Sequence, residues 1–283
     1  MVAAVRNAGI IWSVWPRRLL LVLSVLACAC RRDAAPPPAD AVVIPAGPYG
    51  DAVRRGRALL VATRDSLPAH VGNRLRCVSC HLDEGRRENG SWVGVFARYP
   101  QYRSRSASIE TIEYRVNDCF RRSMNGTALD PAGRDMADIV AYLAFLSHGM
   151  PVGPAPAGAR LQQWASFTAD TAAGARLFAT TCVLCHGPEG EGTVGAPPLW
   201  GPASYNIGAG MARVRTAAEF IRRNMPFDRP GTLTDQQAFD VAAYVNAHPR
   251  PDYRGKEDDW PNGDPPPDVA YPTRAQQKKP LPR

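Results

Sequence analysis

Two short motifs each bring a pair of cysteines and a histidine together. Cys77-Val-Ser-Cys80-His81 and Cys182-Val-Leu-Cys185-His186 both follow the pattern Cys-x-x-Cys-His. In this pattern the thiols bond to the vinyl groups of a porphyrin, and the imidazole binds one axial face of the iron. A redox or zinc-binding Cys-x-x-Cys pair would not require histidine at the next position in both copies. The sequence therefore predicts two covalently bound haem c groups, attached through Cys77, Cys80, Cys182 and Cys185 and bound at iron by His81 and His186.

A six-coordinate haem needs a second axial ligand, and each half of the chain offers one. Cys119 follows His81 by 38 residues, and Met225 follows His186 by 39. A thioether raises the reduction potential of a haem, whereas an anionic thiolate stabilises ferric iron. We therefore predict Cys119 as the second ligand of haem 1, the haem bound by His81, and Met225 as that of haem 2. Haem 1 should be the low-potential centre.

Other interpretations of these two positions remain open. An unpaired cysteine is often only a small buried hydrophobe, and Met124 could bind haem 1 in place of Cys119. Met211 is the rival of Met225, although its loop lies only 25 residues beyond His186. The matched spacing in the two halves favours Cys119 and Met225.

Arginines are concentrated in the sequence around Cys119. Arginine presents a fork of donors that suits oxyanions, and nearby positive charge lowers the pKa of a thiol. Such a run is commonly just a solvated basic face, but this one shares a segment with a proposed iron ligand. We therefore predict an anion-binding site formed from among Arg98, Arg103, Arg105, Arg115, Arg121 and Arg122.

The elements needed to position two haems occur in both halves. A segment with a central glycine precedes each motif, at 51–60 and 170–179, and apolar residues at helical spacing follow at 139–146 and 238–245. This order resembles class I cytochrome c domains. The predicted fold is all-α, with two such domains joined by a Pro/Gly-rich linker, irregular loops and a Pro-rich C-terminal strap.

The N-terminal segment predicts export. A basic flank ending in Arg17-Arg18 precedes an apolar run, Leu19 to Ala27, that is too short to span a bilayer and fits the core of a signal peptide. Val25-Leu26-Ala27-Cys28 resembles a lipobox, so Cys28 is a candidate lipid anchor, with ordinary cleavage as the alternative. We expect a periplasmic protein. The predicted parts are a signal peptide (1–28), a tether (29–48), the haem 1 domain (49–150), a linker (151–164), the haem 2 domain (165–250) and a tail (251–283).

The charge balance is basic. The formal net charge of +8 modestly favours anionic substrates or acidic partners. We expect no nucleic-acid partner.

Residues 99–126, which include the run Asn-Asp-Cys-Phe-Arg-Arg-Ser-Met-Asn-Gly at 117–126, resemble the signature of dihaem thiosulfate dehydrogenases of the tetrathionate-forming type. The resemblance continues at 198–201, 206–211, 224–226 and 250–261, and covers nearly all of 50–272. The run is also similar to the sulfur-oxidation A-type cytochromes. The resemblance implies a His/Cys-ligated haem 1 at the active site and a His/Met haem 2 that passes electrons outward. Some relatives have lysine where Asn224 stands, so we expect Met225 to bind haem 2 in both redox states.

The implied reaction joins two thiosulfate ions into tetrathionate and releases two electrons. An external cytochrome or high-potential iron-sulfur protein would accept them. The sulfane sulfur would contact Cys119, with a covalent S-thiosulfonate adduct as a hypothesis. We expect the charge repulsion to be offset by Arg105, Arg115 and Arg122, with Ser123 and Asn125 as further hydrogen-bond donors.

Three competing functions make different demands. A pure electron carrier would have no substrate site. A dihaem peroxidase would need an open iron site, which two saturated haems do not offer. A cytochrome subunit that couples thiosulfate to a carrier protein would require that partner for activity.

Overall fold

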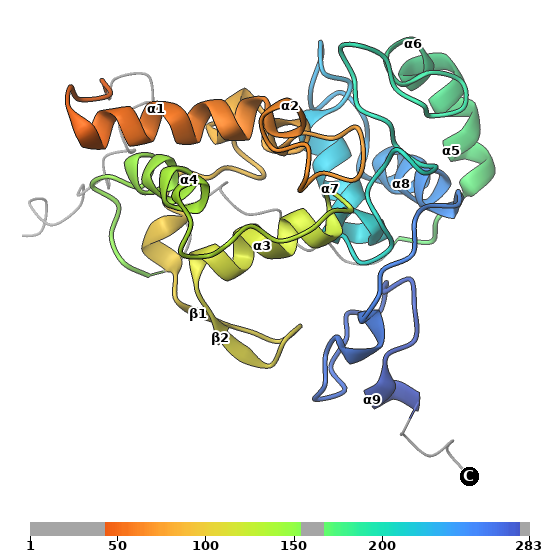
Figure 1. Cartoon of the computed structure of the whole chain (residues 1–283). Helices are drawn as coiled ribbons and strands as arrows, with labels where there is room; N and C mark the ends of the chain where they lie inside the picture. Colours follow the sequence, from red (N-terminus) through yellow and green to blue (C-terminus); the bar gives the residue numbers. More distant parts are fainter. Residues whose placement is uncertain (1–42, 154–166, 278–283) are drawn as a thin grey trace, which may run out of the picture. The chain divides into compact units, whose positions relative to one another are not determined.

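The computed structural model describes residues 43–153 and 167–277, which Figure 1 shows as coloured ribbons. The predicted signal peptide, the candidate anchor Cys28, most of the tether and most of the linker lie outside the described residues. Within the described ranges, no helix combines the length and apolar character needed to cross a membrane. The described residues of both halves belong to one compact unit.

The first half contains four α-helices, three short 3-10 turns and a small hairpin among its described residues. The helices pack around a core of buried side chains that includes Val53, Phe120 and Ile139. Strands β1 and β2 pair antiparallel, with Tyr102 opposite Ile109. The elements are α1 (Pro48–Val61), α2 (Thr63–Ser66), η2 (Cys77–Ser79), η3 (Asp83–Gly85), η4 (Phe96–Arg98), β1 (Gln101–Arg103), β2 (Ser108–Glu110), α3 (Ile112–Arg122) and α4 (Arg134–Phe145).

The second half is helical in its described residues. An aromatic cluster of Phe178, Trp200 and Tyr244 forms part of its core. A capping box begins the last helix of the cytochrome domain at Thr234, since the Thr234 hydroxyl accepts from Gln237 N and the Gln237 side chain accepts from Thr234 N. The elements are α5 (Thr171–Leu177), the π-turn η5 (Phe178–Cys182), α6 (Val183–His186), η6 (Gly210–Ala212), α7 (Val214–Asn224), α8 (Asp235–Ala247), η7 (Lys256–Asp258) and α9 (Arg274–Gln277).

The same helix pair closes each half, as the internal repeat predicted. Helix α1 crosses α4, and α5 crosses α8 (Figure 1). A Cβ atom on Gly56 would lie 1.9 Å from Asp138 O, and one on Gly174 would lie 2.2 Å from Asp240 O. Only glycine therefore allows the two backbones of each pair to approach so closely. The apolar positions predicted for α4 and α8 are buried in both helices.

Candidate haem sites and the arginine cluster

The first haem motif is held so that its histidine can bind a metal. His81 Nδ1 lies 2.6 Å from Gly90 O, so this nitrogen donates to the carbonyl and leaves the lone pair of Nε2 available. The His81 ring stacks on Trp92, with 4.8 Å between ring centroids. Burial lowers the pKa of His81 to about 4, which favours the neutral form that a metal ligand requires.

The second motif repeats this arrangement. His186 Nδ1 lies 2.9 Å from Pro197 O, which again reserves Nε2 for a metal. Burial lowers the pKa of His186 as well. All five cysteines in the described part of the chain are free thiols, so Cys77, Cys80, Cys182 and Cys185 are available for thioether bonds. The residues at both motifs therefore fit a covalently bound haem c.

Cys119 lies in the region of the first haem motif. Burial raises the pKa of both Cys77 and Cys80 to about 12, and the charge of Cys119 contributes to the increase in each. The charge of Cys119 also raises the pKa of Arg115, and Arg115 in turn contributes to the low pKa of His81. Arg115 thus interacts electrostatically with both Cys119 and His81, which places the three side chains in one region. Met124, the alternative ligand, is buried in the apolar core of the same half.

Met225 and Cys119 occupy different positions relative to the helices beside them. Cys119 lies within α3, three residues before the helix ends, whereas Met225 is the first residue after α7. Equal spacing along the chain therefore does not mean equal positions in the two helices. Met211, the rival ligand, is partly buried and packs against apolar clusters of both halves.

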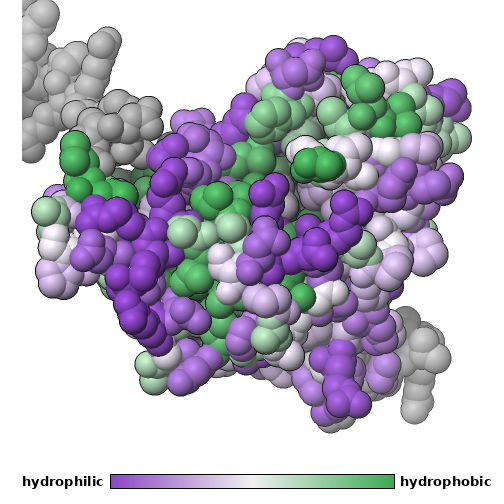
Figure 2. All heavy atoms as spheres, turned by 45° about the horizontal axis from the view of Figure 1, so that its top comes forward, coloured by the Kyte–Doolittle hydropathy of each residue, from purple (hydrophilic) through white to green (hydrophobic). Residues whose placement is uncertain are grey.

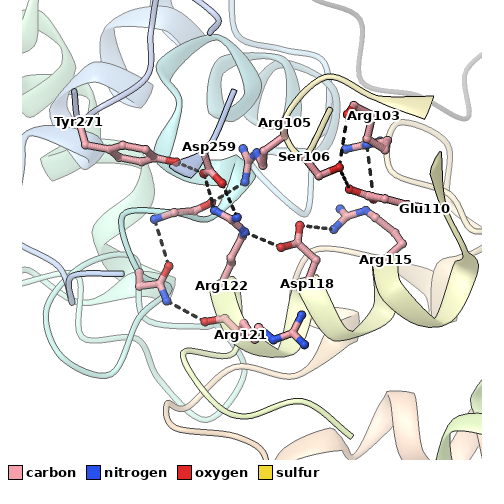
Figure 3. A network of polar contacts seen from close by, with 12 residues as sticks. Arg103, Arg105, Ser106, Glu110, Arg115, Asp118, Arg121, Arg122, Asp259 and Tyr271 are labelled. Atoms are coloured by element: carbon pink, nitrogen blue, oxygen red, sulfur yellow. Dashed lines mark hydrogen bonds and ion pairs between the residues drawn. The ribbon is translucent and has the colours of Figure 1, made fainter. Parts of the chain in front are cut away.

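A buried ionic network surrounds the end of α3 that carries Cys119 (Figure 3). Arg122 Nε lies 2.5 Å from Asp118 Oδ1, and its two terminal nitrogens each lie 2.7 Å from an oxygen of Asp259. Tyr271 donates its hydroxyl to Asp259 Oδ2 at 2.6 Å. Asp259 and Tyr271 come from the C-terminal tail, so the tail is tied directly to α3.

The charge of Arg122 is already compensated inside this network. Arg122 Nη1 also donates to Gly208 O at 3.3 Å. Although burial opposes the charged form, the hydrogen bond to Asp259 and the charge of Asp118 raise the pKa of Arg122. Two carboxylates thus neutralise a guanidinium that the sequence suggested for substrate binding.

Arg105 and Arg115 are paired with fewer carboxylates than Arg122. Arg105 donates from Nη1 to Gly208 O at 2.8 Å, and its guanidinium lies 4.7 Å from the centre of the Trp260 ring. Among the described residues it has no carboxylate partner, and burial, followed by the charge of Arg122, lowers its pKa to about 10. Arg115 Nη1 lies 3.4 Å from Asp118 Oδ2, its one ion pair within the described part of the chain.

The remaining predicted residues lie at the end of α3. Ser123 follows the helix, and its carbonyl accepts from Asn73 Nδ2 at 2.8 Å. Asn125 accepts from Asn206 Nδ2 at 3.1 Å through Oδ1, which leaves its own amide NH2 group to donate. Arg103 Nε lies 3.9 Å from Glu110 Oε2. Figure 3 draws no contact between the Arg121 guanidinium and the network.

Sequence reasoning missed the partners that hold this site together. Asp118 stood inside the quoted run beside Cys119, but its role in pairing arginines was not predicted. Asp259 and Tyr271 belong to the tail, which we expected only to strap the surface. Trp260 is instead 3% exposed, and its backbone N–H donates to Arg105 O at 2.7 Å. In the sequence, the family resemblance at 250–261 was the one signal that pointed to this segment.

The helical fold and the two metal-ready histidine sites define a dihaem c-type cytochrome. A model of the SoxA/TsdA cytochrome c domain matches residues 69–152, and a model of subunit III of cbb3-type cytochrome c oxidase matches 169–245. The chain belongs to the thiosulfate dehydrogenase family. It is 44% identical to the thiosulfate dehydrogenase of Psychrobacter arcticus, over 81% of this chain and 73% of that one, and 40% identical to that of Allochromatium vinosum, over 80% and 91%.

A solved structure supports the same assignment. The thiosulfate dehydrogenase TsdBA of Marichromatium purpuratum, in its as-isolated form, is 40% identical with a TM-score of 0.72. The match covers 78% of this chain and half of that longer one. The predictions of two cytochrome c domains, of two covalently bound haems and of an oxidoreductase of this family are confirmed.

Proposed function

We propose that this protein oxidises two thiosulfate ions to tetrathionate at haem 1 and sends two electrons through haem 2 to an external acceptor. One observation carries the proposal: Cys119 shares the region of His81 and Arg115 in a chain that is 44% and 40% identical to two thiosulfate dehydrogenases over most of its length. His81 and Cys119 would hold haem 1 at iron, and His186 and Met225 would hold haem 2.

The arginines would reduce the repulsion between the two substrates. Two thiosulfate dianions about 4 Å apart repel by roughly 16 kcal/mol at the effective dielectric constant near a protein surface. Arg105 and Arg115 lie beside Asp118 and Arg122 in the buried network but are paired with fewer carboxylates than Arg122, so we assign substrate binding to them. Arg122 would instead hold α3 in place through its two carboxylates. Ser123 and Asn125 would add hydrogen bonds to the sulfonate oxygens.

Cys119 would take part in the bond-forming steps. Its thiolate and one thiosulfate would form a Cys-S-S-sulfonate adduct with the loss of two electrons. A second thiosulfate would attack the sulfane sulfur of this adduct, release tetrathionate and restore the Cys119 thiolate. When bound, the two haems supply one-electron acceptors, one for each electron of a turnover.

The surroundings of the second motif support its role as the electron exit. Cys185 is exposed, and the neighbouring Leu184 is 87% exposed. Figure 2 shows hydrophobic residues reaching the surface in the region of α5 and α6. A cytochrome or a high-potential iron-sulfur protein would be the acceptor there. We also propose that the protein works in the periplasm, with Cys28 as a candidate lipid anchor.

The test uses the oxidised protein with both haems bound. Addition of thiosulfate alone should reduce the haems and produce tetrathionate in the ratio of one tetrathionate per two electrons. Mass spectrometry after a single addition should detect a thiosulfate adduct on Cys119. If thiosulfate reduced neither haem, the protein would be an electron carrier without a substrate site. A requirement for a second protein as thiosulfate acceptor would favour the carrier-coupling alternative.

A further inference from the structure

The loop that follows His81 meets the loop that contains Met225. Asn224 is 1% exposed, and its side-chain Nδ2 donates to Asn89 O at 3.4 Å. Beside this hydrogen bond, the Arg87 guanidinium lies 5.1 Å from the centre of the Phe227 ring. Two contacts, one polar and one cation–π, therefore join the segment next to one haem ligand to the segment next to the other.

The hydrogen bond of Asn224 falls at a sensitive place in the first loop. Asn89 and Gly90 have positive φ angles of 61° and 124°. The carbonyl of Asn89 belongs to the peptide unit that leads into Gly90, and Gly90 O is the acceptor for His81 Nδ1 at 2.6 Å. A turn with such backbone angles persists only where its surroundings hold it. Asn224 thus restrains the peptide immediately before the carbonyl that orients His81.

We infer that Asn224 is a positioning residue for haem 1, although it stands next to the ligand of haem 2. The acceptor of a ligand histidine's second N–H sets the ring orientation and raises the basicity of the ligand nitrogen. A weaker Gly90 O contact would make His81 a poorer electron donor to iron and would destabilise the ferric state. The inference rests on His81 as an iron ligand and does not depend on which substrate is oxidised.

The test replaces Asn224 in the protein with both haems bound. Asn224→Leu keeps the volume of the side chain and Asn224→Ser keeps its polarity, but neither retains the amide NH2 group. Redox titrations followed by electron paramagnetic resonance and visible spectra report the two haems separately. We expect both variants to raise the potential of haem 1, with the ferric-to-ferrous ratio at fixed potential falling by about threefold to tenfold. Tenfold corresponds to 59 mV for a one-electron couple.

A matched control lies one residue earlier. Arg223→Gln changes the charge of the same helix end, but Arg223 pairs with Glu219 on its own helix α7 rather than with the loop that follows His81. This variant should move haem 2 more than haem 1. A shift confined to haem 2 in the Asn224 variants would overturn the inference, as would unchanged potentials of both haems. Failure of both variants to fold with their haems would also overturn it, because Asn224 would then be needed for folding.

A second experiment changes the loop that accepts the Asn224 hydrogen bond. The hydrogen bond from Asn224 Nδ2 to Asn89 O links the two loops, so strain in the first loop should reach the second. Gly90→Ala strains the turn at its positive φ, and a Cβ there would meet only Cys80 O at 3.6 Å. We expect this change to shift the potential of haem 2 in addition to that of haem 1. A response limited to haem 1 would show that the contact through Asn224 does not transmit the change.

Discussion

Helices α3 and α7 have the same length and the same place after their haem motifs, but their surroundings differ. The residues flanking Cys119 on α3 are buried in ion pairs, and Arg122 pairs with Asp259 at 9% and 7% side-chain exposure. On α7, Arg222 pairs with Asp235 at 28% and 53% exposure, and Arg223 pairs with the buried Glu219 from a position that is itself 43% exposed. One helix is fixed by a buried arginine and an ionic network that reaches the C-terminal tail, whereas the paired arginines of the other helix are partly exposed.

The difference indicates that the C-terminal ends of α3 and α7 have different functions. Cys119 lies within a helix whose neighbouring residues are locked on both sides, as a group that must meet substrate in a fixed geometry requires. Met225 lies in the chain after α7, where the buried Asn224 and the Arg87–Phe227 contact hold it. The proposed active-site ligand is therefore held by many strong contacts and the proposed electron-exit ligand by few.

The largest effect should follow loss of the Cys119 sulfur. Cys119→Gly should lower ferricyanide-linked thiosulfate oxidation by about a hundredfold or more, because it removes a group that acts in the reaction itself. The electron paramagnetic resonance signal of haem 1 should change, while that of haem 2 should stay as it is. An unaltered haem 1 signal would show that Cys119 is only a small buried side chain and would remove the contrast between the two helices.

Arg115→Gln should have the next largest effect. Loss of a charged hydrogen bond costs about 1.5–3 kcal/mol, so the KM for thiosulfate should rise by about tenfold to a hundredfold. Arg121→Gln removes the same charge from the same helix and serves as the matched control, with less than a threefold expected change (~0.6 kcal/mol). Equal effects of the two variants would indicate a general charge effect rather than a site at Arg115.

Much of the fold and both haem sites could be predicted because their signals are local. The Cys-x-x-Cys-His motifs and the helical spacing of Ile139 or Val241 are short patterns with direct physical causes. Residue counting matched Cys119 with Met225, but it could not show that one lies inside a helix and the other beyond its end. The pairing of Arg122 with Asp259 could not be predicted either, because Asp259 is 137 residues away in sequence. Strands of three residues, as in the β1–β2 hairpin, are too short to give a recognisable alternation.

Stability measurements test the contrast between the buried and exposed ion pairs directly. Asp259→Ala should lower the free energy of unfolding by about 3–5 kcal/mol, because it leaves Arg122 buried without one of its carboxylates. Asp235→Ala on the α7 pair should cost at most about 1 kcal/mol, since that pair is exposed to solvent. Denaturant unfolding of the haem-bound proteins measures both changes. Similar losses in the two variants would show that the tail does not lock α3 more strongly than the surface pair holds α7.

The smallest expected effect concerns the pH dependence of the first half. The Arg57 guanidinium, 2.7 Å from Nε to Glu84 Oε2, holds the pKa of Glu84 below its ordinary value. Because the folded-state pKa is depressed, this pair stabilises the protein above the unfolded-state pKa of about 4.3 and loses its contribution as pH falls through the folded value. Arg57 is 48% exposed, so the effect should stay within about 1 kcal/mol. Glu84→Gln should remove this part of the acid sensitivity, and denaturant unfolding of both proteins between neutral pH and about pH 3 would measure it. If the difference in stability between the two proteins stayed constant over that range, Glu84 would not titrate as the ion pair requires.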